Sequence, residues 1–170
     1  MTDDLRIGTL EAVLERLIPD DALGPGARAA GVVDYVVRRY AGVDGSAREQ
    51  YAIGLAALDA QAADRGAEDF AGAAPELQDE LLAAAEAAGL ARSDASRGTA
   101  FFETVLRHAR EGMFGDPVHG GNRGYAGWDL LGYPDARRVW RRDEQAIGAV
   151  VVPLTPRGAL PPTTAGESSR

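Results

Sequence analysis

Apolar residues recur along the first two thirds of the chain with the spacing of helix faces. In the first predicted helix, residues 9–18, they fall at i, i+3, i+4, i+7 and i+8, which forms one continuous stripe. The members of this stripe are Leu10, Val13, Leu14, Leu17 and Ile18. Pro19 ends the helix, because the residue before a proline is pushed out of the helical region. A turn-rich connection over residues 20–26 follows.

The same periodicity predicts four more helices. One covers about residues 27–40. The next opens with the capping box Ser46-Ala47-Arg48-Glu49 and fades by Gly66. The fourth runs from Pro75 to a C-terminal cap at Gly89, and the fifth begins near Asp94 or Ser96 and runs into Gly112. The side chains expected to point inward are Val32, Val33, Val36, Val37, Tyr40, Tyr51, Leu55, Leu58, Ala62, Leu77, Leu81, Leu82, Ala85, Phe101, Phe102, Val105, Leu106 and Ala109, with Phe70 as a plug between helices.

The helical pattern then breaks into a loop with six glycines between Gly115 and Gly132. A loop of this length with no obvious element of its own is usually either functional or disordered. A solvated linker has no use for its large apolar side chains, which include Trp128 and Tyr133. We therefore expect an ordered, packed loop whose glycines allow turns that are closed to other residues.

The C-terminal part carries weaker signals. Residues 136–146 are expected to form one more short helix, and residues 150–152 a short extended segment. From Pro153 onward the chain is rich in proline, threonine and serine, which predicts a tail over 153–170 that is irregular and partly disordered alone, or ordered only on partner binding. The sequence thus predicts one all-α, bundle-like domain of five or six helices over residues 1–152, closed by the long loop.

Composition excludes several classes of function. The net charge of -8 argues against nucleic acid as a partner, because phosphate binding needs a basic patch. The absence of cysteine excludes disulfides, iron–sulfur ligation, covalent haem attachment and thiol catalysis. No apolar run approaches the ~20 residues that a membrane span requires. The N-terminus lacks a secretory layout, and the Arg38-Arg39 pair is internal, so a cytoplasmic location without membrane insertion is expected.

Two histidines offer the only imidazole ligands for a metal. A site could be drawn from His108, His119, Asp116 and Glu111, although their spacing matches no established ligand pattern. His108 lies at the margin of an apolar stripe, which favours a packed histidine. One hypothesis is nevertheless a small metal-dependent enzyme that acts on a carbohydrate through His119 and Asp116.

The glycine-rich stretch invites two further interpretations. Gly120-Gly121-Asn122-Arg123-Gly124 could cradle a phosphate, but no strand precedes it and no Lys-Ser/Thr pair follows, so a structural turn is favoured. Asn122 suits a left-handed position or an Asx-turn. Trp128 and Tyr133 could stack on a sugar in a stand-alone binding module, or anchor the loop to the core or to a partner. No serine–histidine–acid set is recognisable.

The loop also carries the parts of a known family signature, namely an aromatic pair on a helix followed by five short glycine-, proline- and aromatic-containing steps. These read Phe101-Phe102, Gly112-Met113-Phe114, Asp116-Pro117, Gly120-Gly121-Asn122, Gly127-Trp128 and Gly132-Tyr133-Pro134. With Leu17-Ile18-Pro19 and Pro25-Gly26-Ala27 upstream, residues 10–134 resemble the small, third subunit of gluconate 2-dehydrogenase and related sugar and polyol dehydrogenases. Two positions depart from the family pattern: His119 stands where tyrosine is usual, and Asp135 where glycine is usual. The twin-arginine export signal that many members carry is also missing.

The resemblance implies a non-catalytic accessory subunit. In such complexes a large FAD-containing flavoprotein of the glucose–methanol–choline type oxidises the sugar, and a multihaem cytochrome often carries the electrons onward. The small subunit supports the stability, maturation or export of the flavoprotein and binds no redox cofactor itself. The residues expected to shape the loop or to bind the partner are Phe114, Pro117, His119, Gly120, Gly121, Asn122, Trp128, Tyr133 and Pro134.

Overall fold

The computed structural model describes residues 5–42, 45–90, 99–135 and 139–153. They form six α-helices and no strand apart from an isolated bridge between Asp21 and Gly24. The predicted all-α class is therefore confirmed. The helices are α1 (Ile7–Leu17), α2 (Val32–Gly42), α3 (Gly45–Asp64), α4 (Pro75–Leu90), α5 (Thr99–Phe114) and α6 (Ala126–Leu130). Three short 3-10 turns follow α5: η2 (Pro117–His119), η3 (Arg123–Tyr125) and η4 (Asp143–Gln145).

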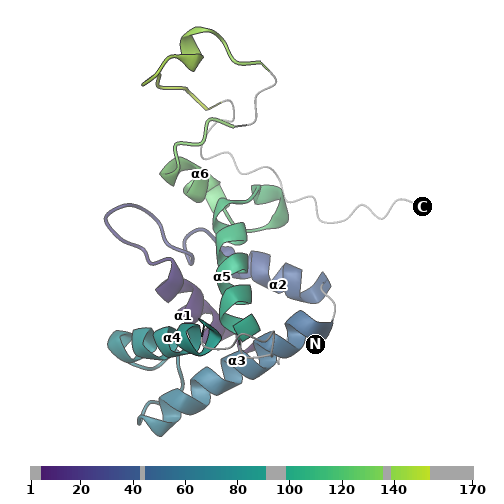
Figure 1. The fold of residues 1–170 in the computed structure, drawn as a ribbon, viewed down its shortest axis with the longest axis vertical. Helices are drawn as coiled ribbons and strands as arrows, with labels where there is room; N and C mark the ends of the chain where they lie inside the picture. The colour runs from purple at the N-terminus through teal and green to yellow at the C-terminus, as the bar shows by residue number, and fades with distance from the viewer. Residues whose placement is uncertain (1–4, 43–44, 91–98, 136–138, 154–170) are drawn as a thin grey trace, which may run out of the picture.

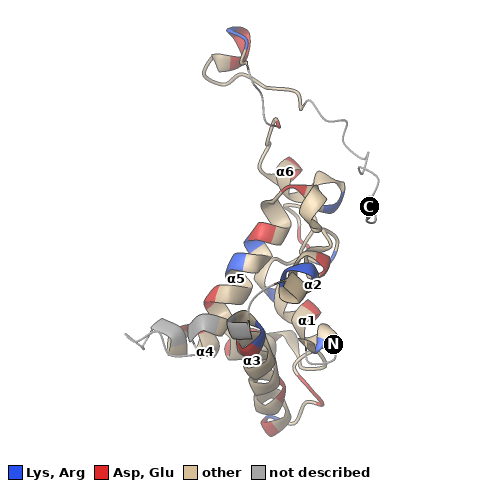
Figure 2. Cartoon of the chain, turned by 90° about the vertical axis from the view of Figure 1, so that its right-hand side faces the viewer, with Lys and Arg blue, Asp and Glu red and all other residues tan. Residues whose placement is uncertain are grey.

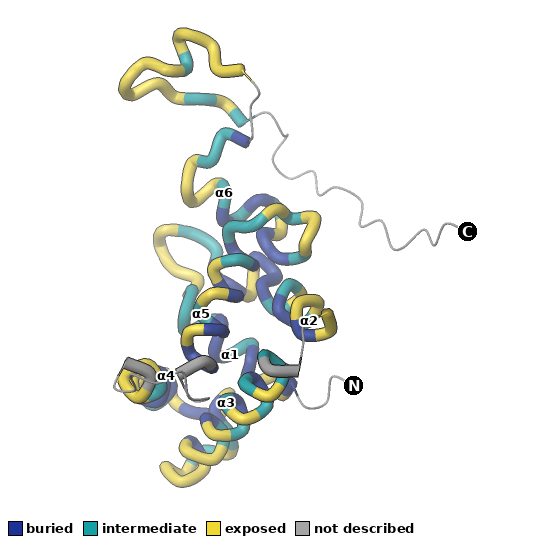
Figure 3. Tube along the Cα trace, turned by 45° about the vertical axis from the view of Figure 1, so that its right-hand side comes forward, coloured by how far each residue is buried: buried dark blue, intermediate teal, exposed yellow. Residues whose placement is uncertain are grey.

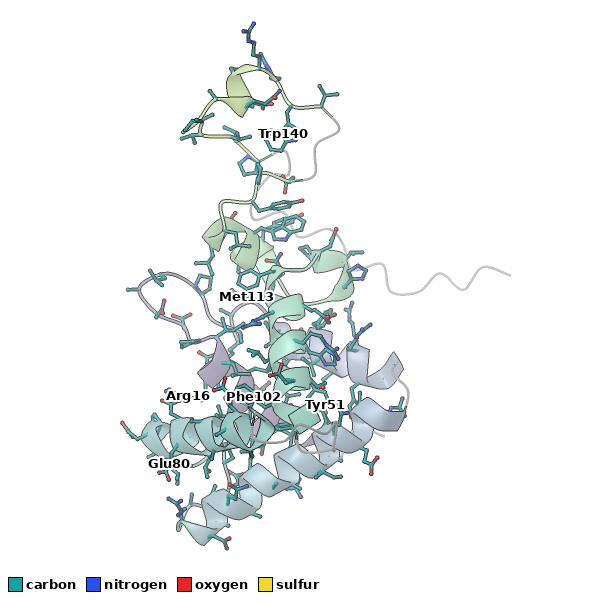
Figure 4. All side chains as sticks on the ribbon, in the orientation of Figure 1. Arg16, Tyr51, Glu80, Phe102, Met113 and Trp140 are labelled. Carbon is teal, nitrogen blue, oxygen red and sulfur yellow. The ribbon has the colours of Figure 1, made fainter. Side chains whose placement is uncertain are left out.

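Helix α5 is the axis of the fold (Figure 1). Each of the other five helices contacts it: α1 and α2 lie along its sides, α3 and α4 meet its N-terminal half, and α6 follows its C-terminal end. Its inner face buries Phe101, Phe102, Val105 and Ala109, as predicted, and Met113 closes the core at the far end (Figure 4). The predicted plug, Phe70, is fully buried between α3 and α4.

Several helix boundaries differ from the prediction: α1 begins at Ile7, α5 continues past Gly112 to Phe114, and two further differences involve glycines. α2 begins at Val32, because residues 27–31 make a single helical turn that ends at Gly31, where φ is +66°. The Val32 and Gly31 amides donate to the Ala27 and Arg28 carbonyls, the paired bonds of a Schellman motif. Gly89 is also not a cap, since α4 continues through it to Leu90.

Other predicted elements are absent, shifted by a residue or outside the described residues. The short helix expected over 136–146 is wrong in its described part, which holds only the η4 turn. α3 begins at Gly45, one residue ahead of the capping box that was predicted to open it. The predicted start of the fifth helix at Asp94 or Ser96 lies outside the described residues, as does the tail beyond Pro153.

A polar junction at Asp59 ties the N-terminal half together. Its carboxylate, on α3, accepts hydrogen bonds from Thr9 Oγ1 at 2.8 Å and from the Phe70 amide at 3.2 Å. Arg6 forms an ion pair with the same carboxylate at 2.8 Å. One side chain thus joins the start of α1, the middle of α3 and the connection to α4, and it is only 13% exposed.

The segment over residues 139–153, which we call the apolar arm, stands away from the helices (Figures 1 and 3). It follows α6 and carries a run of exposed large apolar side chains: Val139, Trp140, Ile147, Val150 and Val152. Trp140 marks its position in Figure 4. In the described part of the chain, no helix combines the length and the apolar character needed to cross a bilayer.

Candidate functional site

The loop after α5, residues 115–134, is held by one fully buried side chain, that of Asn122. Its Nδ2 donates to the Gly115 carbonyl at 2.8 Å, and its Oδ1 accepts from the Gly127 amide at 2.9 Å. Its own backbone amide donates to the Gly112 carbonyl at 2.7 Å. Asn122 adopts the predicted left-handed conformation, with φ 40° and ψ 37°. It therefore joins the end of α5 to the start of α6.

The same loop satisfies the carbonyl groups at the end of α5. The last four carbonyls of a helix have no partner within it and must be paired elsewhere. The backbone amide of Asn122 donates to the Gly112 carbonyl, and the indole Nε1 of Trp128 donates to the Phe114 carbonyl at 2.9 Å. We call residues 115–134 the capping loop, because its polar groups close this helix end.

Two glycines let the loop approach α5 backbone to backbone. A Cβ atom on Gly121 would lie 2.2 Å from the Gly112 carbonyl oxygen. A Cβ on Gly127 would lie 2.0 Å from the Met113 carbonyl oxygen. Both distances are far inside van der Waals contact and both neighbours are main chain, so only glycine fits at either position. The predicted ordered, packed loop with its structural turn is thus what the chain forms.

Three aromatic rings pack over the helix end. The Trp128 ring centroid lies 5.4 Å from that of Tyr125 and 4.8 Å from that of Tyr133. Tyr125 is buried, and the Tyr133 amide donates to the Trp128 carbonyl at 2.8 Å. The rings anchor the loop to the domain. This packing gives no support to a sugar-stacking platform, because Trp128 is engaged through both its ring and its N–H.

Arg123 binds the capping loop to the front of α2, a role that the sequence did not reveal. Its amide donates to the Ala30 carbonyl at 2.9 Å, and its guanidinium pairs with Asp34 at 2.6 Å. Gly31 leaves room for that guanidinium, since a Cβ there would lie 2.9 Å from Arg123 Nη2. The basic residue inside a glycine cluster was the only sequence signal, and its partner lies 89 residues away.

The structure separates the residues of the hypothetical metal site. His108 is buried on α5, and its Nδ1 lies 2.9 Å from the Tyr51 hydroxyl. His119 is exposed at the end of η2, and Asp116 caps that turn by accepting from the Val118 amide at 3.0 Å. Among the described residues, no three histidine, aspartate or glutamate side chains are grouped to hold a metal ion. The packed-histidine interpretation of His108 is confirmed.

Burial shapes the ionisation of the interior groups. Removal from water lowers the pKa of His108 and raises that of Tyr51, so a protonated hydroxyl shares a hydrogen bond with a neutral ring. Burial and a 2.6 Å hydrogen bond to Glu111 raise the pKa of Tyr35 to about 12. Both pairs link α5 to a neighbouring helix, so we interpret them as structural contacts between helices.

The remaining predicted residues lie along the same loop. Phe114 ends α5 half-buried, Pro117 opens η2, and Gly120 has a φ of +85°. Pro134 is half-buried after the aromatic cluster. Their placement agrees with a loop-shaping role, and any role in binding a partner stays a prediction.

Exposed apolar side chains gather at the C-terminal end of the capping loop and on the α1–α2 connection. Leu23, Leu130 and Leu131, which we call the apolar end surface, are 84%, 40% and 64% exposed. Leu23 and Leu130 also line a groove of about 550 Å³ between the α1–α2 connection and α6. The chain then continues into the apolar arm. This end of the molecule therefore exposes several large apolar side chains that do not pack in the helical core.

Fold and loop together define a small all-α domain closed at one end by a glycine- and aromatic-rich cap. The chain belongs to the gluconate 2-dehydrogenase subunit 3 family, whose family model matches residues 5–134. This confirms the resemblance drawn from the motifs, and the match ends where the capping loop ends. Searches of curated proteins and of solved structures found no match.

Proposed function

We propose that the chain is a non-catalytic accessory subunit that stabilises or matures an FAD-dependent dehydrogenase of the glucose–methanol–choline type. Membership of the subunit 3 family supports an accessory role in a dehydrogenase complex. The flavin then resides in the partner, and a cytochrome c subunit is a further candidate member of the complex. The observation that carries the proposal is the exposed apolar end surface, formed by the end of the capping loop together with Leu23.

The apolar end surface has the character of a protein contact. Large exposed apolar patches rimmed by polar residues mark interaction sites, whereas single exposed residues need no explanation. Here Leu130 and Leu131 are neighbours in the sequence, Leu23 lines the same groove as Leu130, and Arg123 and Asp129 add polar groups to the lining of that groove. Burying a leucine side chain fully contributes about 1.5–3 kcal/mol. Three such side chains would contribute roughly 5 kcal/mol to association, before the costs of binding.

The capping loop supports this role by fixing the surface. Asn122, Gly121 and Gly127 hold α6 against the end of α5, so Leu130 and Leu131 leave a short helix of defined orientation. A subunit that binds only the folded partner stabilises it by RT ln(1 + [L]/Kd), about 2.7 kcal/mol when the subunit is at a hundredfold excess over Kd. Stabilisation of this size would raise the yield and flavin occupancy of a marginally stable flavoprotein.

The test is co-expression with the flavoprotein dehydrogenase that the tagged chain captures from its own host, identified by its flavin spectrum and by mass spectrometry. We expect the subunit to raise the yield and flavin content of that dehydrogenase, and to be colourless and inactive alone. The double variant Leu130→Asp/Leu131→Asp should lose this effect. Ile53→Asp is the matched control, because Ile53 is 51% exposed on α3, far from the capping loop.

Two outcomes would contradict the proposal. One is equal yield and flavin content of the dehydrogenase with and without the subunit. The other is substrate turnover by the isolated chain. A thermal melt followed by circular dichroism should show both variants folded, which ensures that a lost effect reflects the surface.

A further inference from the structure

A second concave site lies on the opposite flank of the capping loop, away from the apolar end surface. Tyr35, Arg38 and Arg39 of α2 line it together with His119 of η2, and it encloses about 320 Å³. It unites two sequence features that the accessory role leaves unexplained. These are the internal arginine pair and the histidine at a position where tyrosine is usual in the family that the chain resembles.

The two arginines are not neutralised within the described part of the chain. Other arginines, such as Arg6, Arg16 and Arg123, form ion pairs with aspartates of neighbouring elements. Arg38 and Arg39 are exposed, and neither pairs with a carboxylate of the described residues. Acidic residues outnumber basic ones by 26 to 18, so a pair of uncompensated guanidinium groups is unexpected here. Figure 2 shows the basic stretch on α2.

The pocket residue Tyr35 is hydrogen-bonded to an acidic residue. Glu111 of α5 accepts a hydrogen bond from the Tyr35 hydroxyl at 2.6 Å. Burial and this bond raise the pKa of Tyr35 to about 12, although Arg39 and Arg107 act in the opposite direction. Tyr35 therefore stays a neutral hydrogen-bond donor to Glu111. Neither arginine forms an ion pair with that carboxylate, so both guanidinium groups are available to a ligand on this flank.

Gly120 places the backbone of the capping loop beside Arg38. A Cβ on Gly120 would lie 3.4 Å from both Cδ and Nε of Arg38, which is an ordinary van der Waals contact, so it is the φ of +85° that favours glycine there. The volume lies at the lower end of the range of about 300–1,000 Å³ for small-molecule sites.

We propose that this pocket binds a small oxyanion, a phosphate or carboxylate group, through the guanidinium groups of Arg38 and Arg39 with His119 as a third contact. Guanidinium forks match the oxygen atoms of such groups bidentately, and charge-assisted bonds are about twice as strong as neutral ones. The site is independent of the accessory role, because it shares no residue with the apolar end surface.

The two histidines make a direct test possible. A spectrum of the histidine ring signals by NMR contains one signal from the pocket and one from the buried His108, which serves as an internal control. The isolated full chain is titrated with sodium phosphate, and separately with sodium succinate, at constant pH. Sodium chloride of matched ionic strength corrects for screening. His119→Gln assigns the signals.

We expect the His119 signal to shift saturably with phosphate, succinate or both, while His108 stays in place. Saturation by one anion alone identifies which oxyanion class the pocket takes. Arg38→Gln/Arg39→Gln should weaken this binding at least roughly tenfold, since each variant removes a charge-assisted contact. Arg65→Gln, just after the C-terminal end of α3, removes a basic residue remote from the pocket and should leave Kd unchanged.

The proposal is overturned if neither anion moves the His119 signal beyond the chloride control. It also fails if the double arginine variant and Arg65→Gln give the same Kd. Thermal melts of the variants confirm that each is folded, so a negative result cannot be assigned to unfolding.

Discussion

The Nδ2 atom of Asn122 lies 2.8 Å from the carbonyl oxygen of Gly115, and this contact seals the C-terminal end of α5. The amide has no exposed surface and uses both its donor and its acceptor within the protein. The glycine- and aromatic-rich motif therefore caps the C-terminal end of α5. Its aromatic and apolar side chains determine which surface the cap exposes to solvent.

Asn122→Ala should destabilise the domain by about 3 kcal/mol. The variant leaves the Gly115 carbonyl and the Gly127 amide without their buried partner, and alanine strains the left-handed backbone. Urea or thermal unfolding followed by circular dichroism measures the change. Asp116→Ala, which removes a single exposed cap on η2, should cost about 1 kcal/mol or less. Equal losses in the two variants would show that Asn122 is not the central clamp.

Gly127→Ala should be among the most harmful single-methyl changes in the chain. Its Cβ would lie 2.0 Å from the Met113 carbonyl oxygen, which forces the capping loop away from α5. Gly8→Ala is the matched control, because Gly8 lies in α1 with nothing within 4 Å of the added atom. There alanine should stabilise by up to about 1 kcal/mol. Melting temperatures that move in the same direction in both variants would contradict the close backbone approach.

His108 should make the domain sensitive to mild acid. Burial holds its folded-state pKa below the ordinary 6.5, so the unfolded chain binds the proton more readily. The contribution of His108 to the free energy of unfolding should therefore be constant above pH 6.5 and should fall as the pH drops below 6.5. His108→Gln should flatten that slope in denaturant titrations between about pH 5 and pH 7.

Tyr51→Phe separates titration from hydrogen bonding at the same site. The variant removes the hydroxyl that lies 2.9 Å from His108 Nδ1 but leaves the histidine buried. The acid slope should persist while stability falls by about 1 kcal/mol at every pH. A slope that survives in His108→Gln would assign the acid sensitivity to other groups.

Asp59→Ala should cost about 2–3 kcal/mol, because Thr9, Phe70 and Arg6 all lose their shared acceptor. Asp79→Ala breaks an ion pair with Arg16 in which Asp79 is 55% exposed, so its cost should stay within about 1 kcal/mol. Chemical denaturation of the two variants side by side measures the difference. Similar costs would mean that the junction at Asp59 contributes no more than a surface pair.

Prediction from sequence succeeded where local signals decide the outcome. Helical spacing placed the buried faces of α1, α3, α4 and α5, and prolines marked the end of α1 and the start of α4. It failed where the same local signal is compatible with two different structures. Gly31 ends a separate turn before α2, whereas Gly89 lies inside α4, and the pattern around each glycine alone does not distinguish the two cases.

The sequence by itself determined an all-α domain, an ordered glycine-rich loop with Asn122 in a left-handed turn, and the family to which the chain belongs. These follow from periodicity and from the few residues that tolerate a positive φ, both of which are local properties. Only the tertiary structure decided that Asn122 caps α5, that Arg123 reaches Asp34, and that Arg38 and Arg39 line one pocket with His119. These arrangements join segments up to 89 residues apart, and they are set by how the helices pack.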